Sequence, residues 1–168
     1  LAVNGQDLRG EDDVFRLFQG TAGKQTVLTV GPSASGAGSR QLTVVPIPSE
    51  EGLRLRTWME DNRRRVDEAT GGRVGYLHVP DMGAPGIYEF IKWYYPQIRK
   101  EGLIVDVRSN GGGNVSQWIL ERLDSKLLAT SFGEQSDRPE TYPYTVFHGH
   151  LVCLLNQTSA SDGDIFPA

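Results

Sequence analysis

The chain has 168 residues, of which 38% are hydrophobic, enough for the core of an ordinary domain, and this argues against a wholly disordered protein. Its 17 lysines and arginines are outnumbered by 21 aspartates and glutamates, and the net charge of −4 argues against a nucleic-acid partner, whose phosphates must be neutralised. Nothing resembles a membrane span or a basic-then-apolar leader, so we expect neither a membrane partner nor secretion.

Residues 1–45 are predicted to form a small β-rich segment. Alternating apolar residues indicate strands, and a run of small residues at 31–39 indicates a loop. The expected elements are a strand at 1–3, a helix capped by Asp12 or Asp13, and strands at 25–30 and 40–46. A segment of this size is too small to be a stable domain alone.

After Pro46 the pattern changes to alternating strands and helices. The expected helices span 53–69, 84–100 and 115–128, and the expected strands span 73–79, 103–107 and 151–155. The run 103–107 is apolar apart from Asp106, as is typical of a buried parallel strand, and Pro96 should end or kink the helix before it. The alternation predicts an α/β domain with an open, largely parallel sheet over residues 46–168.

Apolar positions in two segments are expected in the core. Ile87, Phe90, Ile91 and Tyr94 have the spacing of one buried helix face. Cys153 is the only cysteine, so it cannot form an internal disulfide, and its apolar neighbours predict a buried side chain in a reducing compartment. Three histidines without further cysteines have no zinc-like spacing, so we expect no metal and no cofactor.

The segment 106–116 contains three consecutive glycines between a strand and a helix. Without Cβ atoms, Gly111, Gly112 and Gly113 allow backbone N–H groups to approach a ligand closely. The helix N-terminus behind them favours an anion or a developing oxyanion. The residues after the glycines fit neither a phosphate-binding loop nor a dinucleotide fingerprint. A tight strand-to-helix connection without a ligand is the alternative.

The segment 156–166 follows the last strand and places Ser159 and Ser161 among small residues. A serine at a sharp strand-to-helix turn exposes its hydroxyl, and the next N–H can contribute to an oxyanion hole. The alternative is that a serine or aspartate only caps a helix that begins near Gly163. Together with the glycine segment, an exposed hydroxyl and free amides meet the requirements of acyl transfer.

A serine nucleophile needs a general base, and the sequence offers no convincing one. His148 and His150 precede the last strand, which places them roughly 15–20 Å away at the wrong end of the sheet. His78 lies near the carboxyl end of its strand, but it can equally be a buried histidine satisfied by the backbone.

Three stretches taken together resemble the tail-specific and C-terminal-processing serine peptidases, and most of all the tricorn protease branch of that family. They are residues 75–82, 106–116 and 159–166, in the same order over about 90 residues. Residues 1–45 resemble the later part of a PDZ-like domain. The resemblance implies a crotonase-like/ClpP-like βα core, incomplete here, over residues 46–168, preceded by a partial PDZ-like segment.

The resemblance also implies roles for residues of the two turns. Ser161 matches the nucleophile, and the backbone N–H of Asp162 matches one donor of the oxyanion hole. The second donor is expected at Gly113, with Gly112 possible. Gly111 and Gly112 are expected to contact substrate.

Further implications concern the whole peptidase. The base is expected before residue 1 and the acidic relay residue after residue 168, so the chain is expected to be an internal piece that is inactive when isolated. The family's preference for basic residues makes Glu134 and Asp137 candidates for the specificity pocket. Oligopeptide substrates, a homo-oligomer and a cytoplasmic location are expected. The alternatives are a crotonase-like thioester enzyme and a peptide-binding module.

Overall fold

The computed structural model describes residues 1–133 and 139–168. These residues divide into two compact units, 1–55 and 56–168. Helix α2, Glu51–Thr70, runs across the division. Each unit is described below by itself.

The first unit is built on a four-stranded antiparallel sheet in the order β2-β1-β3-β4. Its strands are β1 (Ala2–Val3), β2 (Gln6–Asp7), β3 (Thr26–Val30) and β4 (Arg40–Val44). Helix α1, Val14–Leu17, begins after Asp13, whose carboxylate accepts a hydrogen bond from the N–H of Phe15. The three predicted strands and the capped helix are confirmed, because alternation and capping are local signals, but the last strand ends at Val44, two residues earlier than predicted.

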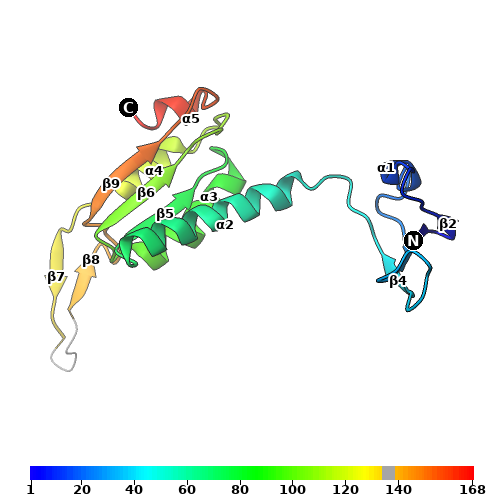
Figure 1. The fold of residues 1–168 in the computed structure, drawn as a ribbon. Coiled ribbons are helices and arrows are strands. Elements are labelled where there is room, and N and C mark those ends of the chain that lie inside the picture. Colours follow the sequence, from blue (N-terminus) through cyan, green and yellow to red (C-terminus); the bar gives the residue numbers. More distant parts are fainter. Residues whose placement is uncertain (134–138) are drawn as a thin grey trace. The chain divides into compact units, whose positions relative to one another are not determined.

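The second unit contains a three-stranded parallel sheet in the order β5-β6-β9 (Figure 1). Its strands are β5 (Val74–His78), β6 (Gly102–Asp106) and β9 (His150–Leu154). The register pairs His78 with Asp106 and Asp106 with Leu154, so the three strands end together. The predicted parallel α/β arrangement is confirmed.

A helix follows each of these strands, and the observed helix ends differ in part from the predicted ones. They are α3 (Ala84–Tyr94), the 3₁₀ helix η1 (Tyr95–Gln97), α4 (Ser116–Leu123) and α5 (Asp162–Ile165). Pro96 lies in η1, where the α-helix has already ended, as expected. Helix α4 ends five residues earlier than predicted, and Leu128 beyond it is 73% exposed.

Two expectations about the second unit are wrong, and one element was not predicted. Ile91 is exposed, because the buried face of α3 is formed by Gly86, Phe90 and Tyr94. Cys153 is only half-buried, although burial still raises the pKa of its thiol to about 11. A short hairpin of β7 (Ala129–Ser131) and β8 (Glu140–Tyr142) was not expected, because its residues are polar and exposed and show no apolar alternation.

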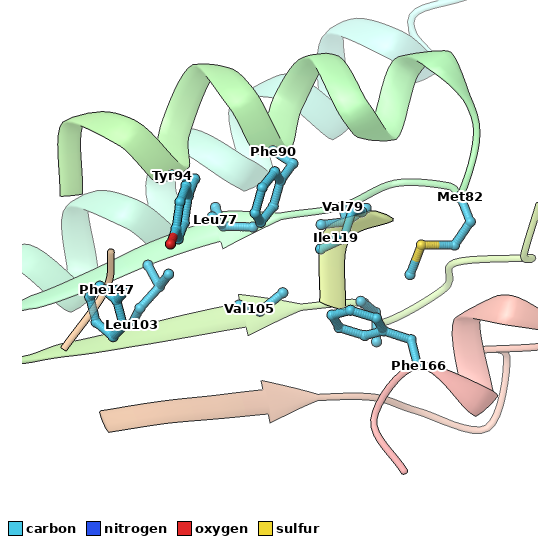
Figure 2. Close-up of a cluster of buried hydrophobic side chains, with 11 residues drawn as sticks. Leu77, Val79, Met82, Phe90, Tyr94, Leu103, Val105, Ile119, Phe147 and Phe166 are labelled. Atoms are coloured by element: carbon cyan, nitrogen blue, oxygen red, sulfur yellow. The ribbon is translucent and has the colours of Figure 1, made fainter. Parts of the chain in front are cut away.

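The core of the second unit lies between α3, the sheet and the later helices (Figure 2). Phe90 and Tyr94 stack with ring centroids 4.8 Å apart. Phe166, from the end of α5, is 5% exposed and packs into the same cluster. Burial of an aromatic side chain stabilises by about 1.5–3 kcal/mol, so Phe166 anchors the segment that carries Ser161 to the core.

Candidate active site

Two turns meet at the carboxyl ends of β6 and β9. We call residues 107–115 the glycine turn and residues 155–161 the serine turn. The N–H of Ala160 donates to the carbonyl of Asn110 at 2.9 Å, and the hydroxyl of Ser159 donates to the carbonyl of Val107 at 2.8 Å. The structure therefore brings together the two segments that the sequence singled out.

Asn110 joins both turns to the end of β5. Its side chain is fully buried, its Nδ2 donates to the carbonyl of Val79 at 3.0 Å, and its Oδ1 accepts the N–H of Gly112 at 2.8 Å. Its own carbonyl accepts from Ala160. Sequence reasoning missed this residue, because an asparagine before glycines is an ordinary turn signal.

Ser161 has a strained backbone and a hydroxyl without a hydrogen-bond partner in residues 1–133 and 139–168. Its φ of 54° and ψ of −128° lie in a region that non-glycine residues rarely adopt, and such strain is concentrated at functional sites. It is the N-cap of α5, yet its side chain makes no capping hydrogen bond. The capping alternative for this hydroxyl is therefore wrong. The residue is exposed at a sharp strand-to-helix turn, the geometry of a nucleophile elbow.

Two of the three glycines lie so close to neighbouring segments that they leave no room for a side chain. Gly112 has φ +98°, and a Cβ added to it would lie 2.6 Å from the Cβ of Ser161. Gly113 has φ +153°, and a Cβ there would overlap the carbonyl of Met82. A Cβ on Gly111, in contrast, would meet nothing within 4 Å.

The backbone N–H groups of the two turns are used differently. The N–H of Gly112 is engaged by Asn110. Among the described residues, no hydrogen bond uses the N–H of Gly113 or of Asp162. These two amides are available to an incoming oxygen.

None of the three histidines is hydrogen-bonded to Ser161. His78 is 3% exposed, its ring packs edge-on against Trp58 at 5.1 Å, and its Nδ1 lies 3.9 Å from Asp106. His150 pairs with Gly102 at the opposite, amino-terminal edge of the sheet. His148 and His150 line a hollow of about 900 Å³ at that edge, which does not include Ser161.

A buried ionic network lies below the glycine turn. Asp106 is fully buried and accepts a hydrogen bond from the hydroxyl of Tyr76 at 2.6 Å. Its carboxylate also accepts hydrogen bonds from Nε and Nη2 of Arg108. Burial alone would raise the pKa of Asp106, but the interactions with His78, Arg108 and Tyr76 outweigh it and hold the pKa well below its ordinary value of 3.8. Burial, together with the hydrogen bond to the charged Asp106, raises the pKa of Tyr76.

We expect Asp106→Asn to lower the free energy of unfolding at pH 7 by about 2–3 kcal/mol, because hydrogen bonds to a charged group are lost. The pKa of Asp106 is lower in the folded protein than in the unfolded chain. At a pH above the unfolded-state pKa of 3.8, the carboxylate therefore contributes fully to the stability of the fold. This contribution is lost as the pH falls from 3.8 towards the folded-state pKa. Urea unfolding at pH 7 and pH 3 measures both effects.

Asp67→Asn is the matched control for Asp106→Asn. Asp67 pairs with Lys100 at 2.8 Å, but its side chain is 58% exposed, so a loss below about 1 kcal/mol is expected. Equal losses for the two variants would contradict a special role for the buried network.

Other sequence-based expectations meet the structure only in part. Glu134 and Asp137 lie outside the described residues. The described residues contain no group of three side chains that could hold a metal ion. None of the described helices combines the length and hydropathy needed to cross a membrane.

Comparison with known proteins extends the similarity to the whole chain. Residues 73–168 match the model of peptidase family S41. The chain is 42% identical over 168 residues to tricorn protease homolog 1 of Streptomyces coelicolor, and 46% identical over 166 residues to the tricorn protease of Thermoplasma volcanium. These alignments cover 100% and 99% of this chain but only 16% of each relative.

A solved structure shows the same similarity. The crystal structure of the tricorn protease superposes with a TM-score of 0.81 at 34% identity, over 98% of this chain and 16% of that one. The chain therefore spans about one sixth of the length of the proteins that it matches.

Proposed function

The chain belongs to peptidase family S41, and we propose that its residues supply the nucleophile and the oxyanion hole of a serine endopeptidase that acts on oligopeptides. The observation that carries this proposal is the strained, exposed Ser161, which lies next to the glycine turn and whose hydroxyl, like the N–H groups of Gly113 and Asp162, makes no hydrogen bond within the described part of the chain. Membership of a peptidase family favours hydrolysis over the thioester chemistry that a glycine turn alone would also permit.

In the proposed reaction, the Oγ of Ser161 attacks the scissile carbonyl carbon while its proton passes to a general base. The carbonyl oxygen becomes an oxyanion that accepts hydrogen bonds from the N–H groups of Gly113 and Asp162. Collapse of this intermediate breaks the C–N bond and releases the amine, which takes the proton. Water then hydrolyses the acyl-enzyme by the same route and regenerates the serine.

The second donor is assigned to Gly113 rather than Gly112, because the N–H of Gly112 already donates to Asn110. Gly112 instead permits the close approach to Ser161, and the exposed Gly111 and the half-buried Gly112 are proposed to offer a backbone surface to substrate.

The general base is proposed to lie outside residues 1–168. This is supported by the environment of His78, which faces Asp106 and Trp58, and by the position of His148 and His150 at the far edge of the sheet. It is also consistent with the length of the chain, which spans about one sixth of the length of its relatives. The active protein is then a longer polypeptide that contains this chain, which we call the parent protein.

Finer features of the parent protein are proposals that follow from the family. We propose that residues 1–45 are part of a PDZ-like domain, and that residues 46–168 are part of a crotonase-like/ClpP-like catalytic core. The parent protein is proposed to be a cytoplasmic homo-oligomer without a cofactor. Glu134 is proposed to contribute to a pocket for basic residues.

The peptidase proposal is tested by mapping the adduct of a fluorophosphonate probe on the parent protein by mass spectrometry. Such probes phosphonylate activated serines. An adduct on Ser161 supports the proposal, whereas an adduct on another residue, or none, contradicts it. Calorimetric binding of a coenzyme A thioester would favour the thioester enzyme instead.

We expect Gly112→Ala to lower kcat of the parent protein by at least about 100-fold. The new Cβ would press on Ser161 and displace the glycine turn, and loss of one oxyanion donor alone costs about 10²–10³-fold. Steady-state kinetics with a fluorogenic peptide measures the loss.

Gly111→Ala is the matched comparison, since its Cβ would meet nothing within 4 Å. It is expected to act on KM rather than on kcat. A kcat for Gly112→Ala equal to that of Gly111→Ala would contradict the proposed close approach of the two turns.

A further inference from the structure

We propose that the carboxylate of Asp162 is a positioning group that ties the serine turn to the first residue of α4, and so fixes the separation of the two oxyanion donors. The inference rests on the proposed function, because it concerns the same oxyanion hole. It assigns a role to the side chain of Asp162 and to Ser116, neither of which touches the reacting atoms.

The contact itself is short and partly buried. The hydroxyl of Ser116 donates to Oδ2 of Asp162 at 2.8 Å, and the N–H of Ser116 approaches the same oxygen at 3.4 Å. Ser116 is 7% exposed. A charge-assisted hydrogen bond in such a place is stronger than a neutral one at the surface.

The carboxylate also completes the N-terminus of α4. Val115, the N-cap residue, provides no side-chain hydrogen bond, so the first N–H groups of the helix need another acceptor. Asp162, which is 46 residues further along the chain, places its oxygen at this position. The negative charge is favourable there because the helix N-terminus carries partial positive charge.

The position of this contact in the chain gives it a specific consequence. Ser116 follows Gly113 by three residues, and the N–H of Asp162 is itself the other proposed donor. The remaining hydrogen bonds between the turns reach only residues before the glycines, namely Val107, Ser109 and Asn110. Among the described residues, Ser116 is thus the one position after the glycines that is hydrogen-bonded to the segment of Ser161.

Met82 holds the glycine turn to the segment after β5, because its carbonyl accepts from Asn114 and its N–H donates to Gly112. It makes no contact of this kind with the serine turn. Without the carboxylate, the N–H of Gly113 can therefore shift relative to that of Asp162 while the turn itself stays folded.

The test uses the parent protein with Ser116→Ala, Asp162→Ala and the double variant. Each is expected to lower kcat by about 100-fold, because a displacement of about 1 Å in a catalytic group typically costs this much. KM is expected to stay unchanged. The double variant is expected to lose no more than Asp162→Ala, because both single variants remove the same contact. Asp162→Asn retains an acceptor oxygen and should restore most of kcat.

The matched control is Ser125→Ala, two residues beyond the other end of α4, where the hydroxyl donates to the carbonyl of Glu121 and, within the described residues, to no group of the serine turn. It should leave kcat unchanged. Kinetics of Ser116→Ala and Asp162→Ala equal to those of the wild type, a loss confined to KM, or additive losses in the double variant would each overturn the proposal.

Hydrogen exchange separates this inference from the proposed function. In Asp162→Ala, the amides of residues 107–119 should exchange faster than in the wild type or in Ser125→Ala, whether or not the protein is a peptidase. A parent protein without a Ser161 adduct would refute the proposed function alone. Unchanged exchange in Asp162→Ala would refute the positioning role.

Discussion

Replacement of Ser161 by alanine in the parent protein is expected to abolish fluorophosphonate labelling and to lower kcat by about 10⁶-fold, the loss typical of removing a serine nucleophile. The reason is chemical, since alanine has no atom that can form the acyl-enzyme bond. What remains is the contribution of the oxyanion hole and of binding, about 10³–10⁴-fold over water. Labelling followed by mass spectrometry and peptide hydrolysis measure the two effects.

Ser159→Ala is the matched control for Ser161→Ala. Ser159 lies two residues earlier in the same turn, but its hydroxyl donates to the carbonyl of Val107 and is not available for attack. Labelling should persist in this variant. Labelling that survives Ser161→Ala and disappears with Ser159→Ala would refute the assignment of the nucleophile.

The isolated 168-residue chain is expected to hydrolyse peptides at a rate well below about 1 s⁻¹, which marks the lower end of the range of ordinary enzymes. A neutral hydroxyl is a poor nucleophile, and among the described residues no histidine is hydrogen-bonded to Ser161. Loss of the base costs about as much as loss of the nucleophile, on the order of 10⁶-fold.

Fluorogenic peptides with basic or apolar residues before the scissile bond measure this activity. The parent protein, assayed with the same peptides, is the positive control. Turnover by the isolated chain that disappears in both Ser161→Ala and His78→Ala would refute the proposal, because His78 would then be the base.

The parallel sheet and the location of the two turns can be predicted from the sequence alone. The strand run at 103–107 is apolar apart from Asp106, as is typical of a strand buried on both faces of a parallel sheet. Consecutive glycines and a cluster of small polar residues directly after strands are likewise local signals of sharp turns. Each of these patterns depends only on neighbouring residues, so one chain was enough to recognise it.

Only the tertiary structure decided which groups of the two turns are free and which are engaged. The positive φ of Ser161, the use of the Gly112 N–H by Asn110 and the contact of Ser116 with Asp162 are not visible as spacing. The exposure of Ile91 was equally beyond the pattern of α3.

The physical reason is that hydrogen bonds between segments depend on the register of the strands beneath them. Asp106 is paired with Leu154, so the residues that follow each strand meet at one edge, although some 50 positions separate them in sequence. A shift of one residue in this register would turn the side chains to the opposite faces of the sheet. The local sequence of either turn is the same in both registers, so only the packed sheet selects the donors that face Ser161.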